Sequence, residues 1–495
     1  MGSVDTQVII AGGGPVGLML AGELRLGGAD VIVLERLTVP RAESRASTLH
    51  ARTMEIFEQR GLLEPLGPVL SGPTGHFGGL PLDFSGLSTP YPGVWKVPQT
   101  RVEELLAGWA AALGADLRRG HEVRAVTLAA DHVEVLTDGP RGPVPLRAHY
   151  VVGCDGEEST VRSFLGIDFP GADADLELLR ADVVGIEVPD RRFERHPDGL
   201  AIASRRPDGV TRVMVHEFGR PAVARPAPPA FAEVIKAWER VTGEDISGGT
   251  PLWLNAFGNA SRQAARYVSG RVLLAGDAAH VQMPVGGQAL NLGLQDAVNL
   301  GWKLAAQVRG GAPDGLLESY HAERHPVGER VLGNIGAQAL LLLGGQEVEA
   351  VRGVLTELIE LPAVARRLAG MISGLDVSYG TDGLDPAAGL LGQRVPAWQV
   401  ATVTGLVPVA TALRSGRGLL LNLTERWSAA GAPWASRVEA LPTAPPPDGP
   451  EHGVLVRPDG HIAWDGASGT GPEVALRRWF GEPSYRGAGA WGAGA

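Results

Sequence analysis

The chain has 495 residues, which is too long for one compact core, so two or three domains are expected. With 44% hydrophobic and 20% charged residues, its composition is typical of a folded globular protein and not of a disordered chain. The net charge is −11, so the positive surface that nucleic-acid binding requires is missing and no nucleic-acid partner is expected.

The cysteine count and the N-terminal sequence limit the chemistry and the setting of the protein. Cys154 is the single cysteine, which excludes an internal disulfide, a metal site built from several thiolates and a paired-thiol redox motif. The N-terminal MGSVDTQ carries an acid and no basic residue, unlike a signal peptide. No run approaches the about 20 unbroken apolar residues of a membrane span. We therefore expect a cytoplasmic protein with no membrane partner and no metal.

The first part of the chain follows a β-α-β pattern. Residues 7–35 predict a strand (QVIIA), a glycine turn (GGGPVG), a helix (LMLAGELRLGG) and a second strand (ADVIVLE). The stretch TRVEELLAGWAAALGADLRRG, 100–120, predicts a helix that ends at a glycine. Further on, HYVVGCDG predicts another strand that runs into a glycine turn.

The middle and the end of the chain have different patterns. From Leu179 to Arg266, strand-like runs such as LLRADVVGIEV and TRVMVHEF alternate with proline-rich loops, which predicts an inserted antiparallel sheet. The first pattern returns at GRVLLAG, and helices dominate from Leu290 to about Ile372. The glycine- and proline-rich residues 379–396 predict a linker, and a small β-α-β-β-α unit follows it.

A glycine fingerprint lies between the first strand and the first helix. Gly12, Gly14 and Gly17 have GxGxxG spacing, and Glu35 ends the second strand. Such glycines let a pyrophosphate approach a helix N-terminus, and the acid accepts hydrogen bonds from ribose hydroxyls. A purely structural glycine turn is the alternative, but the strand, helix and acid favour a dinucleotide site. The fingerprint alone does not distinguish NAD from FAD.

Two later stretches add polar residues after strands. CDGEESTVR places Asp155 behind a strand and Arg162 at helical spacing, although Asp155 as a helix cap is an alternative. RVLLAGDAAH delivers Asp277 to the carboxyl end of a strand, where open α/β sheets bind ligands. Pro284, Gly286 and Gly287 then lead into a helix whose N-terminus is free to face a ligand. The core face of that helix is predicted to consist of Leu290, Leu294, Ala297, Gly301, Leu304, Ala305 and Val308.

The three signatures GGGPVG, CDGEESTVR and GDAAHVQMPVGGQALN occur in the order and spacing of a known family. The sequence resembles the FAD-dependent aromatic hydroxylases, the group A flavoprotein monooxygenases with a para-hydroxybenzoate-hydroxylase-like fold. Longer runs, among them LHARTMEIFEQRGLL and QDAVNLGWKLAA, are similar to hydroxylases that tailor aromatic polyketides such as angucyclines, anthracyclines and tetracyclines. The resemblance covers nearly the whole chain.

The resemblance implies an α/β fold with a Rossmann-like FAD-binding domain, an inserted antiparallel-sheet substrate domain and a C-terminal thioredoxin-like domain. The FAD-binding domain is expected at 1–178, with 76–99 contributing to the substrate domain, and again at 267–378. The substrate domain is expected at 179–266 and the thioredoxin-like domain at 388–495. The last domain has no cysteine, which excludes disulfide exchange.

The fingerprint and the resemblance together give a set of candidate FAD-binding residues, in which Arg45 and Gln99 come from the resemblance. One departure is Ala289, where family members commonly carry glycine; its methyl group either restricts the loop or changes nothing if the backbone is helical. The set is Gly12, Gly14, Pro15, Val16, Gly17, Glu35, Arg36, Arg45, Gln99, Asp155, Arg162, Gly276, Asp277, Pro284, Gly286, Gly287, Ala289, Leu290 and Asn291.

The implied reaction is hydroxylation of an aromatic polyketide in antibiotic biosynthesis. NAD(P)H, with NADPH favoured, reduces FAD, and O2 forms a flavin hydroperoxide that transfers one oxygen to the substrate. The helix N-terminus near Asn291 is expected to stabilise the anionic reduced flavin. The same chemistry also fits Baeyer–Villiger oxygenation or inactivation of a rifamycin-type antibiotic, and a non-catalytic flavin-binding protein is the alternative of a different class. The protein is expected to be a monomer or homodimer.

No catalytic side chain is assigned. His76, His216, Arg205 and Tyr267 lie in segments that border the expected substrate cavity, but such residues are more often structural. His280 is expected to pack or hydrogen-bond behind the glycine loop. The run HFGGLPLDF, 76–84, suits a flat apolar ligand, and an ordinary strand reads the same.

Overall fold

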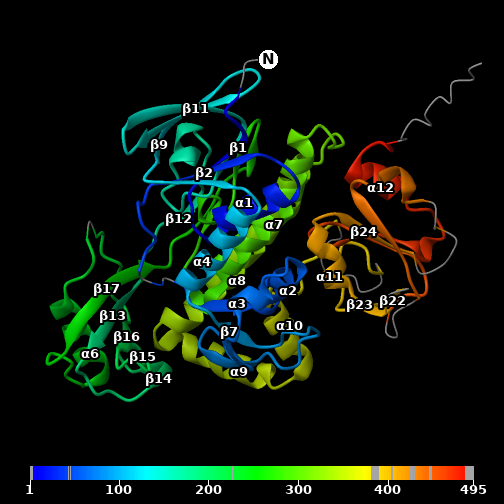
Figure 1. Ribbon diagram of the computed structural model, residues 1–495. Coiled ribbons are helices and arrows are strands. Elements are labelled where there is room, and N and C mark those ends of the chain that lie inside the picture. Colours follow the sequence, from blue (N-terminus) through cyan, green and yellow to red (C-terminus); the bar gives the residue numbers. More distant parts are fainter. Residues whose placement is uncertain are drawn as a thin grey trace, which may run out of the picture.

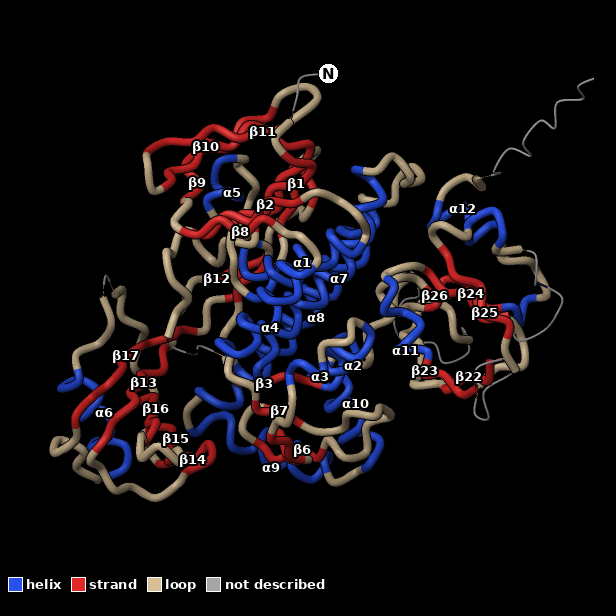
Figure 2. Tube along the Cα trace, in the orientation of Figure 1, coloured by secondary structure: helices blue, strands red, loops and turns tan. Residues whose placement is uncertain are grey.

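The computed structural model describes residues 4–42, 44, 46–225, 227–380, 389–402, 405–422, 427, 430–444 and 449–484 (Figure 1). Figure 2 shows three parts: a main body of strands and long helices, a lobe built on a separate sheet, and a C-terminal unit beside the helices. Within the described residues, no helix has the length and apolarity needed to cross a membrane, and no cluster of His, Cys, Asp or Glu is placed to hold a metal ion.

The main sheet confirms the predicted β-α-β unit. Its order is β19-β20-β11-β1-β2-β8, and β20, β11, β1, β2 and β8 are parallel neighbours. β20 enters the sheet beside β11 although the two are far apart in sequence, as the GRVLLAG run predicts. A hairpin of β9 (Glu122–Leu128) and β10 (Val133–Gly139) pairs with the first half of β11. The other bounds are β1 Thr6–Ala11, β2 Val31–Glu35, β8 Asp116–Arg119, β11 Gly142–Gly153, β19 Val268–Ser269 and β20 Val272–Leu274.

The helices of the body pack on one another beside this sheet. α1 (Pro15–Leu26) lies between α4 (Gln99–Ala112) and α7 (Gln288–Val308), and α8 (Glu318–Leu343) follows α7 (Figures 1 and 2). The prediction of one helix through 100–120 is wrong at its end. The left-handed backbone of Gly114, with φ +90°, follows the end of α4, and Asp116–Arg119 instead pairs with β2 as strand β8.

The lobe is a five-stranded antiparallel sheet of order β14-β15-β16-β13-β17, as the alternating runs predict. One face is covered by α6 (Phe231–Thr242), whose Trp238 is fully buried among the residues of that face. The opposite face packs its apolar residues against α8 and against Met283 and Val285. The bounds are β13 Glu177–Val184, β14 Arg191–His196, β15 Gly199–Arg205, β16 Thr211–Glu217 and β17 Thr250–Gly258.

Short strands and helices join the lobe to the body. The HFGGLPLDF run forms a hairpin, β5 (Thr74–Phe77) with β6 (Leu80–Asp83), and Phe77 and Phe84 pack into a core with α8 and α10. The ordinary-strand interpretation of that run is therefore the better one. The remaining bounds are β3 Thr48–His50, α2 Ala51–Gln59, α3 Leu63–Leu66, β4 Leu70–Gly72, β7 Val94–Lys96, α5 Thr160–Phe164, β12 Gly171–Ala172, β18 Ser261–Gln263, β21 His280–Val281, α9 Glu349–Ile359 and α10 Pro362–Ser373.

The C-terminal unit contains a four-stranded sheet of order β25-β24-β26-β27, in which β24 and β25 are parallel. The three predicted strands and the final helix are confirmed, and the last predicted strand, 452–464, divides into β26 and β27. The helix predicted at 425–437 is wrong over its described part: residues 430–437 form turns around a short 3-10 helix, Ala432–Trp434, where Gly431 and Pro433 interrupt the helical pattern. Residues 425, 426, 428 and 429, and residues 381–388 of the predicted linker, lie outside the described residues. The bounds are β22 Gln399–Thr402, β23 Gly405–Pro408, α11 Val409–Ala412, β24 Gly418–Asn422, β25 Val438–Pro442, β26 Val454–Val456, β27 Ile462–Asp465 and α12 Glu473–Phe480.

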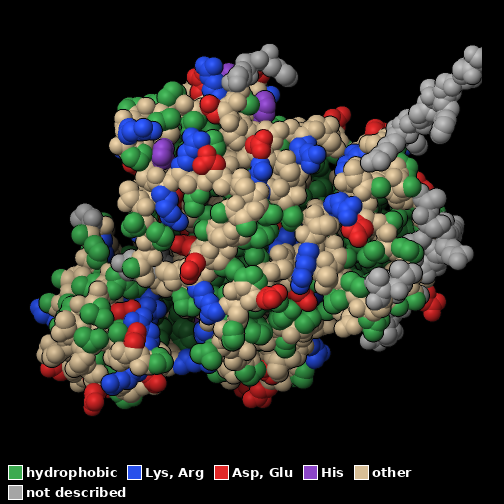
Figure 3. All heavy atoms as spheres, viewed as in Figure 1, with side chains coloured by type: hydrophobic (Ala, Val, Ile, Leu, Met, Phe, Trp, Pro, Cys, Tyr) green, Lys and Arg blue, Asp and Glu red, His purple; other side chains and the backbone are tan. Residues whose placement is uncertain are grey.

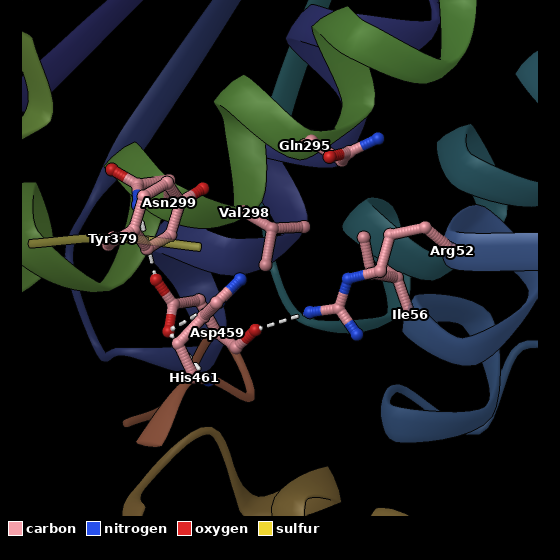
Figure 4. A pocket seen from close by; sticks show the side chains of 8 residues that line it. All are labelled: Arg52, Ile56, Gln295, Val298, Asn299, Tyr379, Asp459 and His461. Carbon is pink, nitrogen blue, oxygen red and sulfur yellow. Dashed lines mark hydrogen bonds and ion pairs between the residues drawn. The ribbon is translucent and has the colours of Figure 1, made fainter. Parts of the chain in front are cut away.

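A buried group of charges joins the C-terminal unit to the helices. Arg457 pairs with Asp459 beside it and with Glu323 of α8, at 2.5 Å between Nη1 and Oε1. Lys303 of α7 lies 2.8 Å from the same Glu323 carboxylate. Arg52 of α2 donates to the backbone oxygen of Asp459 at 2.8 Å, next to a small polar cavity (Figure 4). Because each buried charge has an opposite partner, the unit is held by a specific interface.

Replacing Glu323 with glutamine is expected to destabilise this interface. Burial alone raises the pKa of Glu323, but Arg457 and Lys303 outweigh it and lower the pKa to about 2, below the ordinary 4.5. The carboxylate therefore stabilises the fold above pH 4.5, and this contribution is lost as the pH falls towards 2. We expect Glu323→Gln to lose about 3 kcal/mol in urea unfolding at pH 7.

The matched control is Glu349→Gln, which removes a carboxylate that pairs with Arg195 and is 45% exposed. It is expected to change the free energy of unfolding by less than about 1 kcal/mol. Equal urea midpoints for the wild type and Glu323→Gln would contradict the described role of the buried cluster.

Candidate active site

Four segments that are distant in sequence meet at the carboxyl edge of the main sheet. A Cβ atom on Gly12 would lie 2.3 Å from the backbone oxygen of Cys154. A Cβ on Gly276 would lie 2.9 Å from Val16, and one on Gly293 of α7 would lie 3.2 Å from the Gly276 Cα. The first glycine turn, the turn after β11, the turn after β20 and the start of α7 are therefore in direct contact.

The glycine fingerprint has the geometry of an anion site. Gly12 has φ +106°, and a Cβ on Gly17 would lie only 2.0 Å from the Gly12 backbone oxygen, so both positions require glycine. A Cβ on Gly14 would meet no atom within 4 Å. Pro15 begins α1, where its fixed φ suits the first helical position, and Val16 contacts the turn after β20. The open space beside Gly14 thus lies at a helix N-terminus.

The Glu35 carboxylate lies beside this turn at the end of β2. It accepts hydrogen bonds from the backbone N–H groups of Gly13 and Leu37, each at 2.8 Å. A carboxylate has about four acceptor positions, so two bonds leave capacity for ribose hydroxyls. The neighbouring Arg36 is exposed. Gln99 begins α4 and donates from Nε2 to Glu103 at 2.8 Å. Arg45 lies outside the described residues.

Asp155 and Arg162 connect the turn after β11 to the turn after β20. Asp155 accepts from the Val161 N–H at 3.1 Å and from the Ser159 hydroxyl at 2.5 Å, while Ser159 itself caps α5. The alternative that placed Asp155 at the cap is therefore wrong, because Ser159 is the cap residue and Asp155 binds the Ser159 hydroxyl and one N–H of the first turn. Arg162 donates to the Ala278 backbone oxygen at 2.9 Å and stacks on Phe169 at 3.7 Å. Arg162 thereby fixes the turn that exposes Asp277.

His280 lies behind that turn, as expected. Its side chain is fully buried, and Nε2 lies 2.7 Å from the Asp296 carboxylate of α7. Arg324 of α8 donates to the other oxygen of Asp296 at 2.7 Å. Burial raises the pKa of Asp296, but Arg324 and His280 reverse this and lower it, so the carboxylate is ionised and paired. His280 thus supports the turn from behind.

The start of α7 presents backbone N–H groups. Gly286 and Gly287 both have left-handed backbones, with φ +65° and +69°, and α7 begins at Gln288. No described side chain caps this N-terminus, and the first N–H groups of a helix have no partner within it. Ala289 lies in the first helical turn, where alanine is favoured over glycine. Pro284 is exposed before the turn, and Leu290 packs against the main core.

Asn291 holds this helix start in place with its side-chain amide. Its Oδ1 accepts from the His50 N–H at 2.9 Å and the Thr53 hydroxyl at 2.7 Å. Its Nδ2 donates to the backbone oxygens of Thr48 and Gly287, at 3.1 and 2.8 Å. The His50 ring adds a contact from Nε2 to the Gly286 oxygen at 2.7 Å. Burial lowers the pKa of His50 to about 4, so the ring is neutral at pH 7.

The four side chains that the sequence analysis placed near the substrate cavity do not gather at the N-terminus of α7. Tyr267 is fully buried and accepts from Gln263 at 2.7 Å, and Arg205 is exposed at the end of β15. His216 contacts the backbone oxygens of Glu177 and Leu343. Tyr267 and His216 make structural contacts, Arg205 is exposed, and no catalytic base is assigned among the three. His76 is half-buried in β5 and accepts from the Gly79 N–H at 3.2 Å.

Sequence reasoning missed two sets of residues. The polar face of α7, with Gln295, Asp296, Asn299 and Lys303, is buried as fully as its apolar face. Arg180 of β13 is also buried, at 5% exposure. The available signal was two charged residues, Arg180 and Asp182, within the otherwise apolar run LLRADVV.

This architecture, in which a dinucleotide fingerprint meets an uncapped helix N-terminus beside an antiparallel sheet, defines a class of flavin enzyme. Residues 5–334 match the model of an FAD-binding domain, and residues 388–483 match that of the C-terminal domain of aromatic-ring hydroxylases. The chain belongs to the FAD-binding aromatic-ring hydroxylases and is an FAD-dependent aromatic monooxygenase.

Individual relatives are similar over their full lengths. The 12-dehydrotetracycline 5-monooxygenase/anhydrotetracycline 6-monooxygenase of Streptomyces rimosus is 44% identical, over 97% of this chain and 99% of that protein. A rifampicin monooxygenase of Streptomyces venezuelae is 43% identical, over 96% of this chain and 98% of that protein. The crystal structure of CabE, an aromatic hydroxylase from angucycline biosynthesis, superposes with a TM-score of 0.92 at 49% identity, over 97% of this chain and 100% of CabE.

A pair of alanine variants in the fingerprint tests the cofactor position. Gly14→Ala is expected to leave the stability of the FAD-free protein within about 0.5 kcal/mol of the wild type, because nothing in the protein meets the new methyl group. It is expected to weaken FAD binding at least tenfold by filling the anion site, as measured by titration with FAD fluorescence.

Gly17→Ala is the contrasting variant. Its methyl group would overlap the Gly12 oxygen, so it is expected to destabilise the FAD-free protein by more than about 2 kcal/mol. Wild-type affinity for FAD in Gly14→Ala would show that the pyrophosphate lies elsewhere.

Proposed function

We propose that the protein uses FAD, NAD(P)H and O2 to hydroxylate an aromatic polyketide in antibiotic biosynthesis, with NADPH as the favoured reductant. The observation that carries the proposal is the uncapped N-terminus of α7, next to the Gly286–Gly287 turn, at the meeting point of the four segments. The names of the tetracycline and angucycline relatives support the substrate class.

The candidate FAD-binding residues fit a dinucleotide that extends from α1 to α7. Gly12 and Gly17 allow the tight turn, Gly14 leaves open space for the pyrophosphate, and Glu35 has acceptor capacity for the ribose. Asp277 would meet the cofactor from the exposed turn after β20. When bound, the flavin accepts a hydride from the nicotinamide and activates O2.

The protein's own contribution is placement, charge stabilisation and exclusion of water. N–H groups of Ala289, Leu290 and Asn291 would face the negative edge of the reduced ring, where a helix dipole lowers the energy of an anion. Met283 and Val285 bring apolar side chains from the glycine turn to the face of the sheet lobe that is opposite α6. A flat apolar substrate would lie between this turn and the sheet, close to the ring.

We also propose the domain division that follows from this function. The FAD-binding domain comprises 1–178 and 267–378, the substrate domain comprises 179–266 with a contribution from 76–99, and 388–495 is a thioredoxin-like domain without redox thiols. The parallel β24–β25 pair and the antiparallel β26 and β27 support the thioredoxin-like assignment. The protein would act as a monomer or homodimer.

A second candidate function is oxidative inactivation of a rifamycin-type antibiotic. The rifampicin monooxygenase is 43% identical, almost as similar as the tetracycline enzyme, and it covers the same length. The two functions share the flavin site and differ in the substrate that the sheet lobe accepts.

The proposal predicts oxidation that depends on an aromatic compound. Purified holoenzyme, incubated with NADPH, O2 and separate angucyclinone, anthracyclinone, anhydrotetracycline and rifampicin samples, is expected to consume NADPH faster with at least one polycyclic compound. Mass spectrometry should show a product that has gained one oxygen, and NADH in a parallel assay should give a lower rate.

The outcomes separate the candidates. A gain of oxygen only on rifampicin would favour the inactivation function, and a ring-expanded product would indicate Baeyer–Villiger oxygenation. A flavin-containing preparation whose NADPH oxidation responds to none of the compounds would contradict the hydroxylase proposal and favour a non-catalytic flavin-binding protein.

A further inference from the structure

Arg180 is a buried cation whose Nε and Nη2 atoms have no described hydrogen-bond partner, on the face of the sheet lobe opposite α6. Its side chain is 5% exposed, and no described group makes a hydrogen bond with its Nε or Nη2 atoms. The guanidinium lies over the Trp253 ring, 4.2 Å from the ring centre. An isolated buried charge is costly, so most buried arginines pair with carboxylates or backbone oxygens.

The nearby carboxylate of Asp182 compensates the charge of Arg180 only in part, because two other arginines pair with it. Asp182, two residues along β13, pairs with Arg212 at 2.7 Å and with Arg206 at 3.3 Å. Burial and the positive charge of Arg212 lower the pKa of Arg180 to about 9. The described surroundings therefore carry an excess of positive charge, which favours an anionic ligand.

The face that carries Arg180 is the one turned toward the proposed flavin position. Alternate residues of β13 point to opposite faces, so Leu178 and Arg180 share a face. Leu178 packs in one cluster with Met283 and Val285 of the turn before α7, together with Phe257. Arg180 lies two residues further along β13, or roughly 7 Å. In Figure 3 the surface is hollowed between this lobe and the main body.

The neighbours of Arg180 suit a flat ring system. Met214 and Asn255 lie directly opposite Arg180 on the two adjacent strands. An aromatic ring thus lies against the guanidinium, and a thioether and an amide side chain stand at the paired positions on the same face. The Nε and Nη2 atoms lie on one edge of the guanidinium and form a fork that binds two neighbouring oxygens at once.

Building on the proposed function, we propose that the Nε and Nη2 edge of Arg180 binds two adjacent oxygens of the polycyclic substrate, an ionised hydroxyl and its neighbouring hydroxyl or carbonyl. The charge pair would hold the ring system against the apolar cluster of Leu178, Phe257, Met283 and Val285. Arg180 is a substrate-binding residue that selects phenolates, and through them orients the ring carbon that is oxygenated.

The test measures binding to the FAD-loaded enzyme, through the change in flavin absorbance, for three anthraquinones. The probes are 1,2-dihydroxyanthraquinone, its neutral 1,2-dimethoxy analogue and anthraquinone-2-carboxylate. We expect Arg180→Met to weaken binding of the dihydroxy probe about ten- to a hundredfold, and of the dimethoxy probe less than about threefold. Arg180→Lys should recover only part of the loss, because it restores the charge without the fork.

Thermal unfolding distinguishes ligand binding from a structural role. Removing an uncompensated buried charge is expected to leave the midpoint of the ligand-free Arg180→Met holoenzyme unchanged or raised. The matched control, Arg206→Met, removes a guanidinium that is 41% exposed and should bind the dihydroxy probe like the wild type.

Several results would overturn the proposal. These are equal affinity of the wild type and Arg180→Met for the dihydroxy probe, equal losses for the dihydroxy and dimethoxy probes, or no binding of the dihydroxy probe to the wild type. If Arg180→Met weakened binding of the carboxylate probe alone, the guanidinium would be assigned to a carboxylate ligand. That result would also overturn the phenolate assignment. None of these results decides the proposed function itself, which the oxygenation assay tests separately.

Discussion

The start of α7 is held by one buried amide, and the candidate site depends on it. The four hydrogen bonds of the Asn291 side chain connect the helix to β3, to α2 and to the Gly287 turn. Because these bonds come from a side chain, the backbone N–H groups of the first helical turn are not used to hold the helix. The protein thus fixes a helix N-terminus in position while leaving its polar end available to a ligand.

The rest of α7 is held to its neighbours by buried ion pairs and hydrogen bonds. Asp296 joins α7 to α8 and to the turn after β20 through Arg324 and His280. One turn further on, Asn299 and Lys303 donate to Glu323, which also pairs with Arg457 of the C-terminal unit. Buried ionic contacts require accurate geometry, so they fix the axial position and rotation of the helix. In this arrangement the C-terminal unit, which has no redox thiols, contacts α7 beyond the N-terminus that we propose to face the flavin.

The sequence predicted the features that depend on local physics. The β-α-β unit and the glycine turn follow from short-range periodicity and from backbone conformations that glycine adopts, whereas the order of the three signatures was read from the resemblance to a family. The end of α4 was mispredicted because pairing with β2 at the sheet edge outweighs the helical pattern of 116–119. The burial of Lys303, Asp296 and Arg180 was also missed, because their partners or surroundings come from segments that only the tertiary fold brings close. A single sequence carries the identity of such residues but not their neighbours.

The central claim is that the flavin ring lies against the N–H groups at the start of α7. A crystal structure of the FAD-bound protein tests it most directly. The account predicts N1 and O2 of the ring within hydrogen-bonding distance of backbone N–H groups in residues 288–291, with the pyrophosphate beside Gly14. A ring bound against another element, with the α7 N-terminus capped by a side chain or filled by the protein itself, would contradict it.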